Sequence, residues 1–236
     1  MNQSNDGNVA GRVFFVSGID TDVGKTVVTG LMAKWLAANG VYAATVKMVQ
    51  TGCDGFSEDL EAHRRMSGLG RLPEDDEGLT APQVFKFPSS PSLAARLEGR
   101  SVDVERIASC VDECARRREV VLVEGAGGLL VPLSDDVLAA DFAASRGWPL
   151  VLVTCGRLGS VNHTLLSLEA AKSRGMRVAG VVMNWHPAAD PAIDADTERE
   201  IRRALERMGL PSAFVRVPRV VAGEPLPIVD FSEIFK

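Results

Sequence analysis

The stretch Val13–Thr26 constrains what this chain can fold into more than any other. An apolar run rich in β-branched and aromatic residues ends at Gly18, a short polar loop follows, and Gly24-Lys25-Thr26 opens an amphipathic stretch. This order predicts a strand, a loop and a helix. Such a loop directs backbone N–H groups and the positive end of the helix dipole toward a phosphate. We therefore predict a nucleoside triphosphate site, in which Lys25 reaches the β- and γ-phosphates and Thr26 coordinates Mg²⁺.

The glycine spacing of this loop departs from the usual phosphate-loop pattern G-x-x-x-x-G-K-[ST]. Five residues separate Gly18 from Gly24, and Ile19 stands where the first glycine is usual. A chance Gly-Lys-Thr in a glycine-rich loop is the alternative. The strand before the loop and the helix after it favour the nucleotide site.

Length and charge set further bounds. A chain of 236 residues fits one α/β domain, and we expect a disordered tail at 1–10 and a single domain at 11–236. A net charge of −5 argues against binding along a nucleic-acid backbone. No apolar run reaches the roughly 18 residues of a membrane span, and no secretory leader is present, so we expect no membrane partner and a cytoplasmic protein. The cysteines form no C-x-x-C pair and are expected to be free buried thiols: Cys53, Cys110, Cys114 and Cys155.

Strand and helix patterns alternate along the whole chain, which predicts a mostly parallel sheet with helices on both faces. The strands expected after the first are Val41–Val49, Val120–Val123, Leu150–Val153, Val178–Met183 and Phe214–Val217. Polar or glycine-rich loops follow at Gly18, Lys47, Glu124 and Asn184. In open α/β sheets ligands bind at the carboxyl ends of the strands, so these four positions should share one edge.

Acidic side chains in this pattern have two interpretations each. A carboxylate at the end of a buried strand is costly without a partner, and Mg²⁺ would serve Glu124, although a salt bridge in a tight turn is possible. Asp59 lies in the first turn of an expected helix at Ser57–Met66, where acid also favours the helix dipole. Lys47 alone fits a surface lysine as well as a ligand group. We expect the acidic run Glu74–Glu77 to be a solvated loop.

Four segments, taken together and in order, resemble the dethiobiotin synthetase family. They are Gly18–Thr26, Lys47–Gly52, Val123–Gly128 and Leu158–His163, and the resemblance extends from about residue 12 to about 220. The loop of that family also has five residues between its glycines. The family usually has proline after the lysine of the second strand, where this chain has Met48, which leaves the backbone of Lys47 less constrained.

The resemblance implies a P-loop NTPase-like fold and a homodimer with sites at the subunit interface. It implies an ATP- and Mg²⁺-dependent reaction that converts 7,8-diaminopelargonate and CO₂ (or bicarbonate) to dethiobiotin, through a carbamate and a carbamic-phosphoric mixed anhydride. It implies catalytic roles for Lys47 and Lys25. The ATP-binding residues implied are Asp22, Val23, Gly24, Lys25, Thr26, Val27, Asp59, Glu124, Gly125, Ala126, Gly127, Asn184 and Pro218. The substrate-binding residues implied are Thr51, Gly159, Ser160, Val161 and Asn162, and the metal ligands are Thr26, Asp59 and Glu124.

Two other families share this kind of loop. A cobyrinate-type amide synthetase would need a glutaminase domain with a catalytic cysteine, for which 236 residues leave no room. A partition or regulatory ATPase would carry an extra lysine near the start of the loop, where this chain has Gly18-Ile19-Asp20. ATP turnover that depends on both diaminopelargonate and bicarbonate would separate these alternatives.

Overall fold

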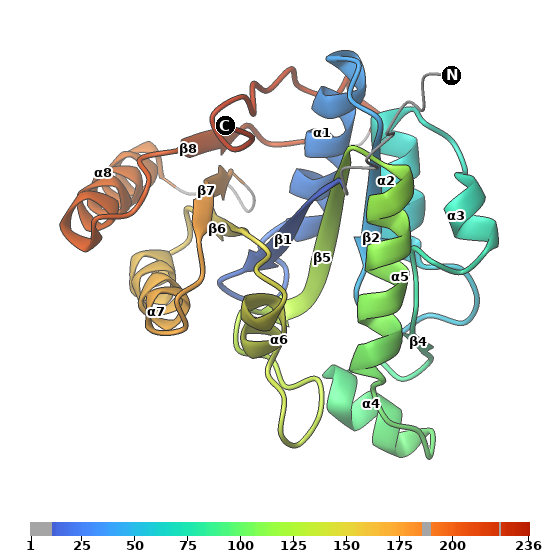
Figure 1. Ribbon diagram of the computed structural model, residues 1–236. Helices are drawn as coiled ribbons and strands as arrows, with labels where there is room; N and C mark the ends of the chain where they lie inside the picture. The colour runs from blue at the N-terminus through green and yellow to red at the C-terminus, as the bar shows by residue number, and fades with distance from the viewer. Residues whose placement is uncertain (1–10, 186–189, 222) are drawn as a thin grey trace, which may run out of the picture.

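A parallel sheet runs through the middle of the molecule (Figure 1). The computed structural model describes residues 11–185, 190–221 and 223–236, so the tail predicted at 1–10 lies outside the described residues. Within them, six strands form this sheet in the order β2-β5-β1-β6-β7-β8. Its strands are β1 (Arg12–Gly18), β2 (Ala43–Lys47), β5 (Val120–Gly128), β6 (Leu150–Cys155), β7 (Val178–Asn184) and β8 (Phe214–Val217). A second, two-stranded sheet pairs β3 (Gln50–Thr51) with β4 (Val84–Phe85).

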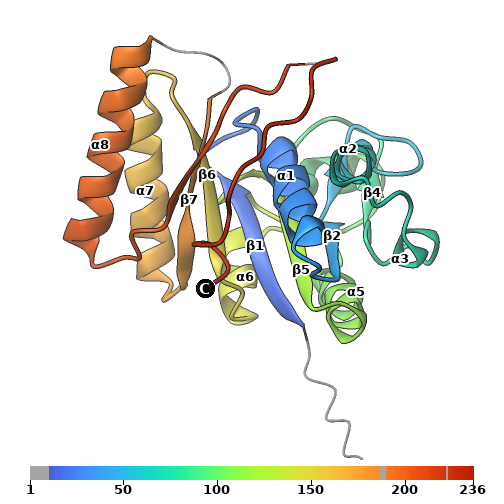
Figure 2. The same ribbon diagram turned by 90° about the horizontal axis from the view of Figure 1, so that it is seen from above.

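Helices cover both faces of the large sheet, as the alternating pattern predicts. They are α1 (Lys25–Ala38), α2 (Glu58–Ser67), α3 (Pro73–Asp76), α4 (Pro91–Leu97), α5 (Val104–Arg117), α6 (Ala139–Ser145), α7 (Ser160–Ser173) and α8 (Pro191–Met208). In Figure 1, α1 and the C-terminal segment lie on one side of the strands, and α6 and α7 lie on the other. Figure 2 shows α7 and α8 side by side at one end of the sheet. None of the helices in the described residues is both long and apolar enough to cross a membrane.

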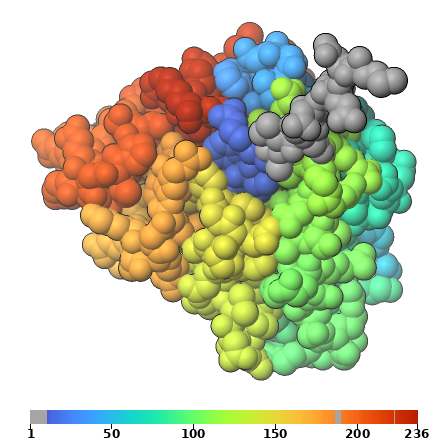
Figure 3. All heavy atoms as spheres, in the orientation of Figure 1, coloured from blue at the N-terminus to red at the C-terminus, as the bar shows by residue number. Residues whose placement is uncertain are grey.

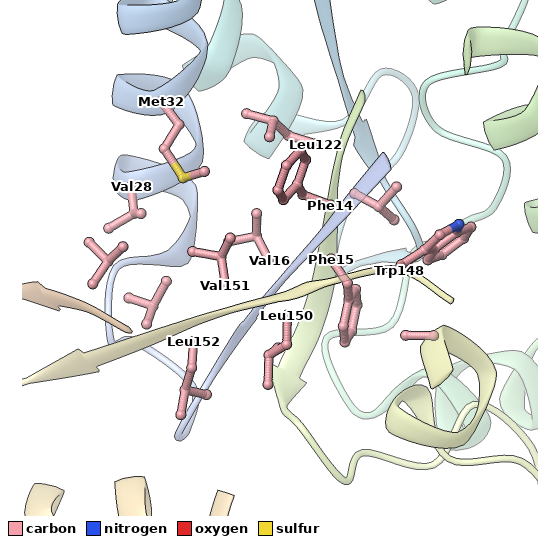
Figure 4. Packing of buried hydrophobic residues seen from close by; sticks show 14 of the residues in the cluster. Phe14, Phe15, Val16, Val28, Met32, Leu122, Trp148, Leu150, Val151 and Leu152 are labelled. Carbon is pink, nitrogen blue, oxygen red and sulfur yellow. The ribbon is translucent and has the colours of Figure 1, made fainter. Parts of the chain in front are cut away.

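The core is built on β1, whose side chains are buried on both faces as expected of a central parallel strand. Phe14 faces α1 and Phe15 faces the opposite side, beside Trp148 (Figure 4). The ring of Phe14 meets Phe235 edge-on at 5.1 Å, and Phe235 stacks on Trp35 of α1 at 5.5 Å. The last residues of the chain therefore complete the α1 face of the core, and in the space-filling view the red C-terminal segment lies against α1 (Figure 3).

The strand register brings the predicted positions to one edge. Lys47 of β2 lies opposite Glu124 of β5, and Gly18 of β1 lies opposite Gly128. Asn184 ends β7 next to the end of β6. The expectation that these strand ends share one edge is confirmed. One detail is wrong: β5 does not stop before Glu124 but continues through Gly128, because β1 and β2 both pair with it at Glu124 and β1 pairs with it again at Gly128.

The acidic run at 74–77 is not the solvated loop that we expected. Glu74 and Asp75 are buried in α3, whereas Asp76 is exposed. Arg118 binds Glu74 with two hydrogen bonds of 2.8 and 2.5 Å, and Arg64 binds Asp75 with two of 2.8 and 2.6 Å. A bidentate guanidinium gives a buried carboxylate the partner that it needs, and the run of acids alone does not reveal the arginines.

Candidate active site

The loop between β1 and α1 has little room for side chains. Gly24 has φ +88°, and a Cβ there would lie 2.0 Å from Nδ2 of Asn184. That amide nitrogen donates a hydrogen bond to the carbonyl of Val23 at 3.0 Å. Asp22 also has positive φ, at 58°. Asn184, at the end of β7, therefore fixes the loop at the point where only glycine fits.

Lys25 begins α1 and is buried at the mouth of this loop. Its ammonium donates a hydrogen bond to the carbonyl of Asp20 at 2.9 Å. Burial lowers the pKa of Lys25 to about 8, opposed by the nearby carboxylates of Glu124 and Asp59. A partly desolvated cation at a helix N-terminus is a strong attractant for phosphate.

Four predicted residues from four different elements meet beside Lys25. Oγ1 of Thr26 lies 2.9 Å from Oδ1 of Asp59 and 3.1 Å from Oε1 of Glu124. Nζ of Lys47 lies 2.5 Å from Oδ2 of Asp59 and 2.8 Å from the same Glu124 oxygen. Ser57 places Asp59, because its hydroxyl caps α2 by accepting from the N–H of Leu60 at 3.2 Å. A hydroxyl and two carboxylate oxygens around one point are the hard donors that suit Mg²⁺, so the residues fit that ion.

The charges in this group support one another. Burial alone would lower the pKa of Lys47, but the carboxylates of Glu124 and Asp59 outweigh burial and raise it. Burial alone would raise the pKa of Glu124, but the Lys47 charge and the hydrogen bonds from His63 and Lys47 hold it well below its ordinary value. Glu124 is therefore ionised at neutral pH although its side chain is fully buried.

His63 belongs to this group and was missed in the sequence. It is fully buried, and its Nε2 lies 2.8 Å from Oε2 of Glu124. Its Nδ1 lies 3.1 Å from Oγ1 of Thr45 on β2. The signal that could have found it is spacing, since His63 follows Asp59 by one helical turn and thus shares its face of α2.

Two cavities adjoin the loop between β1 and α1. The first, the lysine cavity, measures about 590 Å³ and is lined by Thr21, Asp22, Gly24, Lys25, Thr26, Lys47, Val49, Gln50, Thr51, Asp59, Glu124, Ala126 and Gly127. The second, the α1–α2 cavity, measures about 630 Å³ and is lined by Gly24, Thr26, Val27, Ala62, Arg65, Met66, Asn184, Val220, Val221, Gly223, Glu224 and Leu226. Both are lined by Gly24 and Thr26, so one extended ligand can occupy both across the loop.

Most predicted residues lie on these two cavities, but some do not. Thr51 lines the lysine cavity next to Lys47. Pro218 follows the end of β8, and it does not line the α1–α2 cavity, to which the segment after β8 contributes from Val220 onward. The predicted segment at 159–162 begins α7 and contributes to neither lining. Ser160 in it is buried, with its hydroxyl 3.3 Å from Sγ of Cys155.

Comparison with known proteins gives this geometry its context. A family model described as an AAA domain matches residues 12–221. ATP-dependent dethiobiotin synthetase BioD 2 of Pasteurella multocida is 44% identical over 196 residues, which cover 83% of this chain and 92% of that protein. ATP-dependent dethiobiotin synthetase BioD of Chlorobaculum tepidum is 47% identical over 205 residues, covering 87% and 86%. The chain belongs to the dethiobiotin synthetase family.

The dethiobiotin synthetase fold also has a more distant structural likeness. The crystal structure of a ParA family ATPase from Chlorobium tepidum superposes with a TM-score of 0.53 at 18% identity, covering 89% of this chain and 86% of that one. This likeness concerns the fold alone. It confirms the predicted P-loop NTPase-like architecture of this dethiobiotin synthetase family member.

Proposed function

We propose that residues 11–236 act as one synthetase domain that converts 7,8-diaminopelargonate, CO₂ and ATP to dethiobiotin, ADP and phosphate in biotin biosynthesis. The observation that carries this proposal is the convergence of Lys25 and Lys47 on one cavity beside the Thr26, Asp59 and Glu124 oxygens. The four free, buried cysteines fit a reducing compartment such as the cytoplasm.

ATP would span both cavities. Its phosphates lie against Lys25, the loop amides from Asp22 to Gly24 and the hydroxyl of Thr26, where helix dipole and ammonium charge act together. Its base and ribose enter the α1–α2 cavity, between Val27 and Asn184. The small residues of β5 from Gly125 to Gly127 would keep the phosphate edge free of bulky side chains.

Thr26, Asp59 and Glu124 would hold Mg²⁺, which, when bound, neutralises charge on the ATP phosphates. The Lys47 ammonium now joins the two carboxylates by 2.5 and 2.8 Å contacts. A lysine is a point charge on a flexible stem, so it can turn from the carboxylates toward a substrate oxygen without leaving the cavity.

The reaction needs charge stabilisation more than covalent help from the protein. One amine of diaminopelargonate adds CO₂ and loses a proton, which gives a carbamate. A carbamate oxygen attacks the γ-phosphorus, ADP leaves, and the second amine attacks the carbamoyl carbon to expel phosphate and close the cyclic urea. Lys47 stabilises the carbamate and the transferring phosphoryl group, Lys25 stabilises the phosphates, and the hydroxyl of Thr51 hydrogen-bonds the substrate.

The N-terminal turn of α7 would serve a second subunit. Gly159, Val161 and Asn162 do not line their own lysine cavity, and neighbouring Leu158 is 91% exposed. An exposed apolar residue beside a helix N-terminus suits a two-fold dimer in which each α7 holds the carboxylate of the substrate in the partner's site.

Subunit mixing tests this arrangement. Lys25→Ala disables the site that its own subunit houses, and Asn162→Asp places a like charge against the substrate carboxylate in the partner's site. Each variant alone should be nearly inactive. In a co-refolded equal mixture, half of the dimers carry one intact site, so activity should return to roughly a quarter of wild type. No recovery, with subunit exchange confirmed by mass, would contradict the shared site.

The reaction itself is tested by turnover of the whole protein. ADP release should require diaminopelargonate and bicarbonate together, and mass spectrometry should detect dethiobiotin in equal amount. Lys25→Ala is the matched control, because it removes the phosphate contact and leaves the fold. A rate of ATP hydrolysis that does not depend on diaminopelargonate would contradict the proposal and favour a regulatory ATPase.

A further inference from the structure

His63 is a buried polar side chain with no part in the chemistry described above. It lies on α2, one turn after Asp59, and its ring is fully buried where α2 packs on β2. Both ring nitrogens have partners, Oγ1 of Thr45 at 3.1 Å and Oε2 of Glu124 at 2.8 Å. A histidine so placed cannot reach a ligand in the lysine cavity, which its side chain does not line. It can act only through Glu124.

The neighbouring donors set the direction of these hydrogen bonds. Nη1 of Arg64 donates to Oγ1 of Thr45 at 2.7 Å. The Thr45 hydroxyl is then free to donate its own proton to Nδ1 of His63, which leaves the ring N–H on Nε2. That N–H points at Oε2 of Glu124. The three groups form one chain of donors that ends on the carboxylate, and hydrogen bonds in such chains strengthen one another.

The far end of this chain is anchored. Arg64 is held by two hydrogen bonds to Asp75, and Asp75 also accepts from the hydroxyl of Thr80 at 2.6 Å. Arg64 and Asp75 are both buried. The orientation of His63 is therefore set by a fixed ion pair and not by packing alone.

We propose that His63 is a positioning residue for the metal-binding carboxylate, an inference that rests on the proposed role of Glu124. His63 occupies Oε2, so that Oε1 is the oxygen presented to Thr26 and Lys47 at 3.1 and 2.8 Å. Without that donor, Oε2 is a buried anionic oxygen without a partner. The carboxylate then rotates, and Oε1 is no longer held in place for Thr26 and Lys47. Losing the outer partner of a metal ligand typically costs about 10- to 100-fold in metal affinity.

Two substitutions at this position separate the two ring contacts. His63→Gln places an amide N–H near the position of Nε2 and keeps the bond to Glu124. His63→Asn places its amide near Nδ1, keeps the side facing Thr45 and leaves Oε2 of Glu124 without its donor. A role in packing alone would lower the thermal stability of both variants and would not act selectively on the Mg²⁺-dependent part of nucleotide binding.

The measurement is calorimetric binding of ADP with and without Mg²⁺, beside dethiobiotin formation and thermal unfolding. His63→Asn should reduce the gain in ADP affinity that Mg²⁺ provides by about 10- to 100-fold, with metal-free ADP affinity unchanged. His63→Gln should keep the gain within a few-fold of wild type. In a Glu124→Gln background, His63→Asn should have no further effect, because the two act through one contact.

The failures can be told apart. If Glu124→Gln itself leaves the Mg²⁺ response unchanged, the proposed metal role of Glu124 fails, and the inference on His63 falls with it. If Glu124→Gln abolishes the response but His63→Asn keeps it, or if Gln and Asn behave alike, the positioning role is wrong. Should either variant fail to fold, Thr45→Val removes the hydroxyl that orients the ring, and it must weaken the Mg²⁺ response in the same direction for the inference to stand.

Discussion

This protein contains two neighbouring groups of paired charges, and the two groups use different cations. The site group contains Lys25, Lys47, Asp59 and Glu124 at the edge of the lysine cavity. The docking group contains Arg64 with Asp75 and Arg118 with Glu74, and it joins α3 to α2 and to the end of α5. Each group has two positive and two negative side chains.

The contacts differ as the cations do. Each arginine of the docking group binds one carboxylate with two parallel hydrogen bonds, and this bidentate geometry fixes the orientation of both side chains. In the site group, Lys47 divides its ammonium between two carboxylates and a carbonyl, and Lys25 donates to the carbonyl of Asp20. A reaction centre needs cations that can change partners, whereas a scaffold needs cations that cannot. In this protein, lysine supplies the cations of the group that we propose does the chemistry, and arginine supplies those of the group that holds the fold.

The largest effect should come from breaking the docking group. Asp75→Asn keeps the shape but leaves Arg64 as a buried charge without its anion, and we expect the free energy of unfolding to fall by about 3–5 kcal/mol. Urea denaturation measures it. Asp76→Asn is the control, because Asp76 and its partner Arg71 are both exposed, and it should match wild type. A loss below about 1 kcal/mol for Asp75→Asn would mean that the Arg64–Asp75 pair does not stabilise the fold.

Removing a lysine from the site group should have the opposite result, with a large loss of activity and little loss of stability. Lys25→Ala deletes a preorganised charge, so we expect dethiobiotin formation to fall by about 10²–10³-fold. Stability should stay close to wild type, because Lys25 forms no salt bridge within the described residues, and its burial already disfavours the charge. Steady-state turnover and urea denaturation of the same sample check both parts. Near-normal turnover in the folded variant would reject the phosphate-loop assignment.

A smaller effect should come from exchanging the two kinds of cation. Lys47→Arg keeps the charge but should bind Asp59 and Glu124 as a fork and lose the freedom to turn. We expect turnover to fall by up to about 10²-fold, as for a misplaced catalytic group, while ADP binding without substrate stays close to wild type. Full activity of this variant would show that the lysine–arginine distinction has no catalytic meaning.

The smallest effect concerns acid. Burial alone would raise the pKa of Asp75, but hydrogen bonds from Arg64, Thr80 and the N–H of Leu72 outweigh it and lower the pKa below its ordinary 3.8. A lowered folded pKa gives stability that is present above pH 3.8 and is lost as the pH falls through the folded value. Wild type should therefore lose stability below about pH 4 more steeply than Asp75→Asn, in urea denaturation from pH 3 to 6. Parallel curves would contradict this.

The sequence predicted those features that follow from strand ends. Lys47 and Glu124 are placed by parallel strands, whose carboxyl ends must share an edge, and the glycine spacing located the loop. The positions of His63 and of the arginine partners of the acidic run depend on how α2 packs on β2 and how α3 packs against α2 and the end of α5. That docking is set by contacts between residues distant in the chain, such as Arg118 with Glu74, and no local pattern encodes them. The length of β5 was missed for a similar reason, because its glycine end is a strand only when β1 lies beside it.

The position of β1 in the sheet has a consequence for how the protein is made. Phe14 and Phe15 leave the ribosome early, but their neighbours are Leu122 of β5 and Leu150 of β6. At a synthesis rate of about 5–20 residues per second, roughly 5 to 20 s pass before the first of these strands exists. During that interval this central strand of the sheet has no partner on either edge. Growth temperature and translation speed should therefore govern the yield of soluble enzyme more than the stability of the finished fold does, because the vulnerable species is the nascent chain.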